Sequence, residues 1–169
     1  PQSVMIFGLQ GIARDDPDFI PAYVMNYILG GGGFSSRLTE EVREKRGLAY
    51  SIGTYLYPMD HAAMWLGQVG TKNERVGQTL SLVRKELARM AEEGVTAEEL
   101  KDAKTYLTGS YPLRFISNRS IANQLLGIQL GGYGIDYVDR RNALIEAVTR
   151  EDVARVAKRL LKPDNLRVT

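Results

Sequence analysis

The sequence has no cysteine and one histidine, His61. Without cysteine, neither a disulfide nor a thiolate metal site can form within the chain. A catalytic zinc site needs about three protein ligands, usually His, Glu or Asp, and the H-x-x-E-H and H-E-x-x-H patterns are both absent. His61 follows Pro58-Met59-Asp60 in a predicted turn, where a polar side chain is ordinarily solvated. The sequence therefore predicts no metal site in this chain.

Two other common sites also lack their motifs. A Ser-His-Asp triad would have to use the single histidine, and no serine lies in a G-x-S-x-G turn. The run Gly30–Gly33 lacks the G-x-x-x-x-G-K-[ST] spacing of a phosphate loop and follows a predicted helix rather than a strand. We expect a flexible connector between two helices, and the N-terminus of the second helix could bind a carboxylate weakly. The candidate substrate-binding or hinge positions are Gly31, Gly32, Gly33 and Ser36.

The chain also has no large excess of positive or negative charge. The chain has 22 basic and 20 acidic residues, and a net charge of +2 is too small to indicate a nucleic-acid partner. No run approaches the ~18 apolar residues that a membrane helix needs, so no membrane insertion is predicted. Adjacent like charges on predicted helices, such as Glu92-Glu93 and Arg140-Arg141, are interpreted as solvated faces, because neighbours on a helix rarely share a site.

The two ends of the chain favour a fragment of a longer protein. The first residue is Pro1 rather than methionine, and the last residues, 166–169, look like the start of a strand. We therefore expect a fragment or a processed chain, from which a targeting segment could be missing. The absence of cysteine fits the cytoplasm and the bacterial periplasm alike, so the compartment stays open.

The first half of the chain predicts strands and two helices. A strand is expected over Gln2–Leu9, followed by a helix with Asp16 as N-cap that ends at the glycine run. A second short helix is capped by Ser35 or Ser36 and closed by Gly47, and a hairpin follows over residues 50–57 and 62–70. Strict alternation along the first hairpin strand places Tyr50 on the same side as Ile52, Thr54 and Leu56.

The second half predicts a series of helices. Apolar residues at helical spacing form one stripe; they are Val76, Leu80, Val83, Leu87 and Met90. Thr96 with Glu99 forms a capping box for the next helix. The helix over residues 118–130 is expected to turn Ile121, Leu125 and Ile128 inward. The last helix is capped by Thr149 and ends before Pro163, and a closing strand is expected over 165–169.

These elements predict the fold class. Of the 169 residues, 44% are hydrophobic and 25% are charged, as in ordinary globular domains. No linker, repeat or low-complexity tract divides the chain apart from the glycine run. We therefore expect residues 1–169 to form one two-layer α+β domain, with a mostly antiparallel sheet covered by helices on one face.

One segment carries a resemblance to a known family. Residues 35–51 read S-S-R-L-T-E-E-V-R-E-K-R-G-L-A-Y-S, which resembles the most recognisable block of the C-terminal, non-zinc domain of the pitrilysin/insulinase zinc peptidases. The similarity extends to the glycine run, the hairpin, the helix break at Gly94–Thr96 and the helix that opens at Thr149. It implies a domain that binds a peptide substrate, while a homologous domain or subunit holds the zinc.

The resemblance also implies two site residues. In that family an arginine and a tyrosine seven residues apart, on the non-zinc domain, help to bind and polarise the substrate carbonyl, and the matching positions are Arg43 and Tyr50. A guanidinium and a phenol are suitable donors for the negative charge that builds on a carbonyl oxygen under attack. The alternative is that Arg43 pairs with a nearby glutamate and Tyr50 packs in the sheet. The glycine run is shorter here than the corresponding loop of the mitochondrial processing peptidase, so a hinge role is sufficient for it.

Three functions remain open from the sequence. The chain could be the substrate-binding half of a zinc metalloendopeptidase, inactive in isolation. It could instead be a structural relative without proteolysis, like the core subunits of a respiratory complex, or an unrelated peptide- or phosphate-binding module. The presence of both Arg43 and Tyr50 favours the first, because a structural domain has no need of the pair. Family members also hold a peptide as an added strand at a sheet edge.

Overall fold

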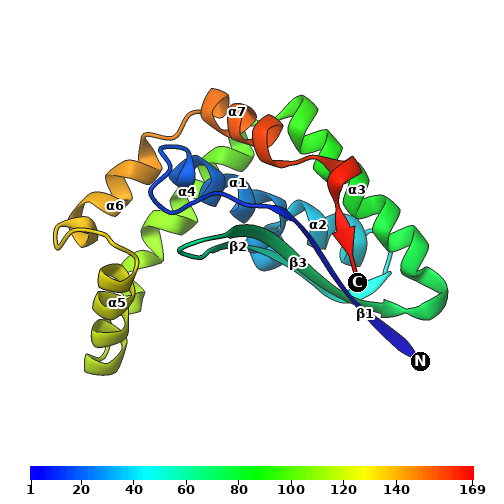
Figure 1. Cartoon of the computed structure of the whole chain (residues 1–169), viewed down its shortest axis with the longest axis horizontal. Helices are drawn as coiled ribbons and strands as arrows, with labels where there is room; N and C mark the ends of the chain where they lie inside the picture. The colour runs from blue at the N-terminus through cyan, green and yellow to red at the C-terminus, as the bar shows by residue number, and fades with distance from the viewer.

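The computed structural model describes all 169 residues. Four strands form one sheet in the order β2-β3-β1-β4, and every neighbouring pair is antiparallel. The strands are β1 (Gln2–Gln10), β2 (Ala49–Pro58), β3 (Ala63–Lys72) and β4 (Arg167–Val168). All helices except α5 lie on one side of the sheet (Figure 1). The predicted two-layer α+β fold is therefore confirmed.

The helical layer contains seven α-helices and several shorter turns. The helices are α1 (Phe19–Asn26), α2 (Arg37–Thr39), α3 (Val76–Glu93), α4 (Ala97–Gly109), α5 (Asn118–Leu130), α6 (Tyr137–Glu146) and α7 (Arg150–Leu160). Two π-helical turns, Tyr27–Gly31 and Glu40–Glu44, extend α1 and α2. None of the helices combines the length and the apolar character that a bilayer span requires.

A single core of 32 buried hydrophobic residues lies between the sheet and the helices. Strand β1 alternates as expected, with Met5, Phe7 and Leu9 buried and Val4 and Ile6 exposed on the uncovered face. The stripe on α3 is confirmed at Val83, Leu87 and Met90, all of which are fully buried, while Val76 and Leu80 are partly buried. Capping boxes open α4 at Thr96 and α7 at Thr149, as predicted.

The amide of Asn26, at the end of α1, joins the helical layer to the sheet. Its Oδ1 accepts hydrogen bonds from Thr54 Oγ1 and from Trp65 Nε1, each at 2.8 Å. Its Nδ2 donates to the backbone oxygen of Thr54 at 3.2 Å. Asn26, Thr54 and Trp65 are all buried, so these bonds satisfy polar groups that would otherwise destabilise the core.

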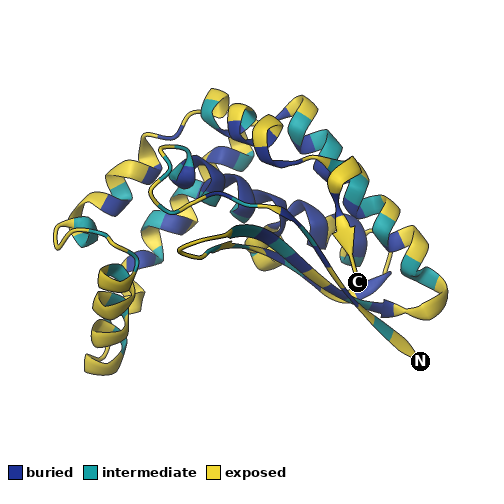
Figure 2. Ribbon diagram, viewed as in Figure 1, coloured by how far each residue is buried: buried dark blue, intermediate teal, exposed yellow.

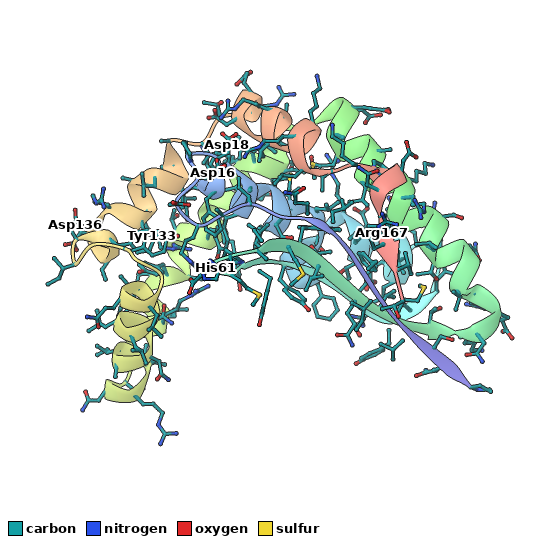
Figure 3. The ribbon with its side chains drawn as sticks, in the orientation of Figure 1. Asp16, Asp18, His61, Tyr133, Asp136 and Arg167 are labelled. Atoms are coloured by element: carbon teal, nitrogen blue, oxygen red, sulfur yellow. The ribbon has the colours of Figure 1, made fainter.

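Helix α1 begins later than the sequence predicted. Asp16 does not cap it; its carboxylate accepts the backbone N–H of Asp18 at 2.9 Å, and the first helical residue is Phe19. The carboxylates of Asp16 and Asp18 both point toward α7 (Figure 3). There Asp16 pairs with Arg159 at 2.6 Å, and Asp18 pairs with Arg155 at 2.7 Å. These ion pairs hold the preceding turn against α7, which explains the later start of the helix.

Helix α5 contradicts the predicted inward face. None of its residues is buried, and Ile121 and Leu125 are 36% and 48% exposed. Figure 1 shows that α5 projects away from the sheet, and in Figure 2 its surface is mostly exposed. The prediction was wrong because the spacing of apolar residues is helical whether or not another element covers the face. Of the three residues predicted to face inward, Ile128 alone lines a hollow, together with the polar residues Asn123 and Gln124.

Glu86 is a buried carboxyl group on α3. Its side chain is 1% exposed, and Oε2 accepts no hydrogen bond, although Arg89 Nη1 lies 3.3 Å away. Burial raises the pKa of Glu86, and the negative charge of Glu41 adds to this effect, while Arg89 and Arg37 oppose it. The folded state therefore favours the protonated carboxyl, and its stability decreases as the pH rises above the ordinary carboxyl pKa of 4.5.

We predict that Glu86→Gln raises the free energy of unfolding at pH 7 by on the order of 1 kcal/mol, because it removes a buried charge while keeping the shape. Below the ordinary carboxyl pKa the gain should disappear, since Glu86 is then protonated in both states. Urea unfolding at both pH values measures the effect. Glu92→Gln, at an exposed position of the same helix, is the matched control; an equal gain there would contradict the prediction.

Candidate functional site

Most residues of the segment 35–51 have a structural role. Leu38 and Val42 are fully buried in the core. The buried guanidinium of Arg37 holds Glu99 of α4 with two hydrogen bonds, from Nε at 2.6 Å and from Nη2 at 2.7 Å, and Nη2 also donates to the backbone oxygen of Gly94. This fork joins α2 to the start of α4. Arg43 is left on the outer side of the segment, where its side chain is partly exposed.

The end of this segment brings Arg43 close to the start of β2. Gly47 has a φ of +58°, which favours glycine. Its N–H bonds to the backbone oxygen of Arg43 at 2.8 Å, and the N–H of Leu48 bonds to the oxygen of Val42 at 2.8 Å. The chain therefore turns back directly after the helical turn, and β2 starts at Ala49.

A β-bulge places Tyr50 on the surface. Ala49 pairs with Thr71 and Ile52 with Val69, so Tyr50 and Ser51 together lie opposite a single residue of β3. The predicted alternation, which grouped Tyr50 with Ile52, was wrong at this position because the extra residue shifts the register. Ile52 is buried, whereas the side chain of Tyr50 is 83% exposed.

Arg43 lies between two aromatic rings, in a group that we call the arginine–aromatic cluster (Phe34, Arg43 and Tyr50). The Cζ atom of Arg43 is 4.4 Å from the ring centroid of Phe34 and 5.0 Å from that of Tyr50. Its Nε lies 3.3 Å from Oε1 of Glu44. Contacts of this kind contribute about 0.5–1 kcal/mol at exposed sites, so they orient the guanidinium more than they stabilise the fold.

The structure thus brings together the two residues that the resemblance singled out. The alternative was that Arg43 pairs with a nearby glutamate and that Tyr50 packs in the sheet. The first part holds, because Arg43 pairs with Glu44, but the side chain of Tyr50 is exposed. Phe34, which no sequence motif singled out, is 71% exposed beside Arg43. Its position directly after four glycines was the available signal, because a large aromatic side chain there has little local structure to bury it.

The glycine run packs closely against its surroundings. A Cβ at Gly30 would lie 2.5 Å from Thr54 Oγ1, one at Gly31 would lie 2.7 Å from Asn26 Nδ2, and one at Gly32 would lie 2.7 Å from the backbone oxygen of Tyr27. The π-helical turn also continues through Gly31, so the first glycine does not end the helix as predicted. At these three positions glycine is required for close approach rather than for flexibility.

Gly33 and Ser36 complete this segment. Gly33 has a φ of +58° and open space around it, so it is the position that best fits the predicted hinge. The hydroxyl of Ser36 is buried; it donates to the backbone oxygen of Gly33 at 2.8 Å and lies 3.0 Å from Thr39 Oγ1. Ser36 therefore fixes the end of the glycine run and presents no free surface to a ligand.

The residues of this chain do not fit a zinc ion. No three His, Cys, Asp or Glu side chains gather where they could hold a metal. His61 lies exposed in the turn of the β2–β3 hairpin, as expected for a solvated turn residue (Figure 3). No reaction step in this chain is therefore assigned to a metal.

Comparison with known proteins assigns the family. The model described as "Peptidase M16 inactive domain" matches residues 1–107. An uncharacterized zinc protease of Streptomyces coelicolor is 36% identical over 160 residues, which are 95% of this chain and 35% of the relative. A protein of Helicobacter pylori described as a non-peptidase homolog is 37% identical over 125 residues, 73% of this chain and 28% of the relative. The chain spans about a third of the length of these relatives.

Solved structures agree with this assignment. The peptidase M16 inactive domain from Pseudomonas fluorescens is 34% identical, with a TM-score of 0.88, over 99% of this chain and 40% of that chain. The inactive peptidase domain of a Bordetella parapertussis protein has the same fold, with a TM-score of 0.83 at 15% identity over 100% of this chain and 91% of that chain. The latter chain is hardly longer than this one.

These matches define the class as an inactive peptidase-type domain. The chain belongs to the peptidase M16 inactive-domain family. The resemblance to the non-zinc domain of the pitrilysin/insulinase peptidases is thereby confirmed, as is a relationship to zinc proteases.

We predict that Gly30→Ala destabilises the domain by about 1–3 kcal/mol, because the new methyl group would overlap Thr54 in a packed region. The measurement is urea unfolding followed by circular dichroism. Gly77→Ala on α3, where a Cβ meets nothing within 4 Å, is the control and should stabilise the chain by about 0.5–1 kcal/mol. A loss smaller than a few tenths of a kcal/mol for Gly30→Ala would show that the contact is not close-packed.

We also predict that the isolated chain binds no zinc stoichiometrically and hydrolyses no peptide, since it lacks three ligands for a catalytic zinc. Metal analysis after incubation with zinc and dialysis gives the measurement. One tightly held zinc per chain would contradict the prediction, and His61→Ala would then show whether the single histidine is a ligand.

Proposed function

We propose that this chain is the substrate-binding half of a zinc metallopeptidase, in which Arg43 and Tyr50 donate hydrogen bonds to the scissile carbonyl. The observation that supports the proposal is the arginine–aromatic cluster, because it holds a guanidinium and a phenol together at the surface. A homologous domain, in the same chain or in a separate subunit, would supply the zinc.

The chemistry of the two side chains fits this role. Attack on a peptide carbonyl builds negative charge on its oxygen, and donors that are already oriented toward that position stabilise the charge in the transition state. The phenol of Tyr50 has no hydrogen-bond partner in the chain, and Arg43 keeps donors free because Glu44 takes only its Nε side. Phe34 would act as a positioning residue by fixing the plane of the guanidinium.

The sheet offers two surfaces for a peptide. Its uncovered face carries exposed apolar and aromatic side chains; they include Val4, Ile6, Tyr55 and Tyr57. At the outer edge of β2 the backbone oxygens of Ile52 and Thr54 already accept from Thr39 and Asn26. The other edge is formed by β1, which pairs with β4 at Phe7 and Gly8 and exchanges two backbone hydrogen bonds with Thr169 at Ile6. Addition of a peptide strand at a sheet edge is a known mode of recognition.

A second candidate function is a structural role without proteolysis. The Helicobacter pylori relative, described as a non-peptidase homolog, favours it. In that case Arg43 and Tyr50 would be surface residues without a substrate. We also propose that residues 1–169 are one domain of a longer protein, in keeping with the share of the relatives that they span.

We predict that, with the zinc-bearing half present, Tyr50→Phe lowers kcat by about 100-fold, as for the loss of one donor to the developing oxyanion. Arg43→Met should lower kcat at least as much. Peptide hydrolysis under saturating substrate measures both effects. The control is Tyr106→Phe, at an exposed tyrosine of α4, which should leave kcat unchanged.

The outcomes separate the two candidate functions. An unchanged kcat in Tyr50→Phe would reduce Tyr50 to a surface residue. A rise in KM without a fall in kcat would assign the pair to substrate binding alone. Absence of any hydrolysis by the complete protein, with intact zinc ligands in the partner domain, would favour the structural role.

A further inference from the structure

A hollow of about 280 Å³ lies between α1, α5, α6 and the end of β2, on the far side of the domain from the start of β2. Three arginines line it, and its walls include the rings of four tyrosines. No aspartate or glutamate is among the lining residues. We call it the arginine pocket, and its most buried polar lining residues are Arg141 of α6 and Tyr111.

Arg141 is a buried cation without a carboxylate partner. It is 5% exposed, which contradicts the expectation that Arg140-Arg141 forms a solvated face. Its Nη1 donates to the backbone oxygen of Leu107 and to Asn142 Oδ1, each at 3.0 Å. Its Cζ lies 4.1 Å from the ring centroid of Tyr111. Nε and Nη2 have no acceptor in the chain, and they are not among the unpaired polar atoms that are shut off from solvent, so they are open to a ligand.

The hydroxyl of Tyr111 is also without a partner. It is a buried polar atom that makes no hydrogen bond in the chain. Burial raises the pKa of Tyr111. The hydroxyl has no contact with solvent, so it lies behind the surface of the hollow, and native proteins leave few buried groups unpaired in this way.

The more open side of the pocket adds positive charge. Arg14 lies 5.5 Å from the ring centroid of Phe19 and 5.7 Å from that of Tyr133, and Arg114 is exposed nearby. Figure 3 shows Tyr133 on the connection between α5 and α6. A second hollow of about 450 Å³ shares Arg14 and Tyr133 with the pocket and continues along the hairpin turn. A ligand longer than the pocket therefore has a path to the surface.

We propose that the arginine pocket binds a carboxylate carried by an aromatic or aliphatic body. The carboxylate would accept from Nε and Nη2 of Arg141, and the tyrosine rings would enclose the apolar part. A carboxylate matches the planar fork of a guanidinium, and hydrogen bonds between charged groups are about twice as strong as neutral ones. The proposal does not depend on peptidase activity, because it involves neither Tyr50 nor Arg43.

The test compares N-acetyl-L-phenylalanine with N-acetyl-L-phenylalaninamide, which differ in the charge of one group. Binding to the 169-residue chain is measured by calorimetry and by shifts of backbone amide signals in NMR spectra. We expect the acid to bind with a dissociation constant of millimolar or below, and the amide to bind at least about 10-fold more weakly. Equal affinities, or no binding of the acid at about 10 mM, would overturn the proposal.

Variants assign the binding to the pocket. Arg141→Met should weaken binding of the acid by at least about 10-fold, whereas Arg140→Met, at the exposed neighbour that pairs with Asp136, should not change it. Equal losses in Arg140→Met and Arg141→Met would overturn the assignment. If Arg141→Met does not fold, Arg14→Met, at another arginine of the lining, decides the question by the same criterion.

A third arm identifies the source of the carboxylate. The peptide Gly-Gly-Gly-Gly-Phe presents the same terminal group on a longer chain that would have to leave through the second hollow. Affinity equal to that of the small acid would assign the pocket to peptide C-termini, and binding of the small acid alone would assign it to free organic acids. Either result supports the carboxylate site.

Discussion

The hydrogen bonds of Asn26 hold the helical layer and the sheet at a fixed distance, and the site depends on that distance. One amide group satisfies two side chains and one backbone oxygen of the hairpin, all of them buried. The end of α1 must therefore lie directly on β2, and a side chain at Gly30 or Gly31 would prevent this. This contact explains the glycine run, because a larger residue would not fit between α1 and β2. Phe34 comes next in the chain and lies beside Arg43.

The fold class could be predicted from the sequence because its signals are local and repeated. The stripe on α3, the capping boxes at Thr96 and Thr149 and the alternation of β1 each specify an element without reference to the rest of the chain. The start of α1 could not be predicted in this way, since Asp16 and Asp18 are held by arginines more than a hundred residues away. The same limit applies to α5, whose helical pattern is correct although no element covers it.

The site was predictable in its residues but not in its geometry. The resemblance pointed to Arg43 and Tyr50, yet strict alternation would have turned Tyr50 toward the core. One extra residue in β2 reverses that outcome, and nothing in the sequence Ala49-Tyr50-Ser51-Ile52 marks a bulge, because glycine is absent from it. For Arg141 the error has the opposite direction, because a residue expected on the surface is buried. Two adjacent arginines in the sequence suggested a solvated helix face, but tertiary packing places Arg141 against Tyr23 and Tyr111.

The exposure of α5 gives the domain two levels of cooperativity. Helices α3 and α7 share the buried core, so their backbone amides open only when the domain as a whole unfolds. Helix α5 contributes no buried residue, and a helix of 13 residues is marginal in water by itself. Its own hydrogen bonds and a capping box, in which Ser117 and Ser120 bond to each other's backbone N–H groups, therefore set its opening, which is local. Since α5 also forms one wall of the arginine pocket, a ligand bound there would couple the order of this helix to the rest of the domain.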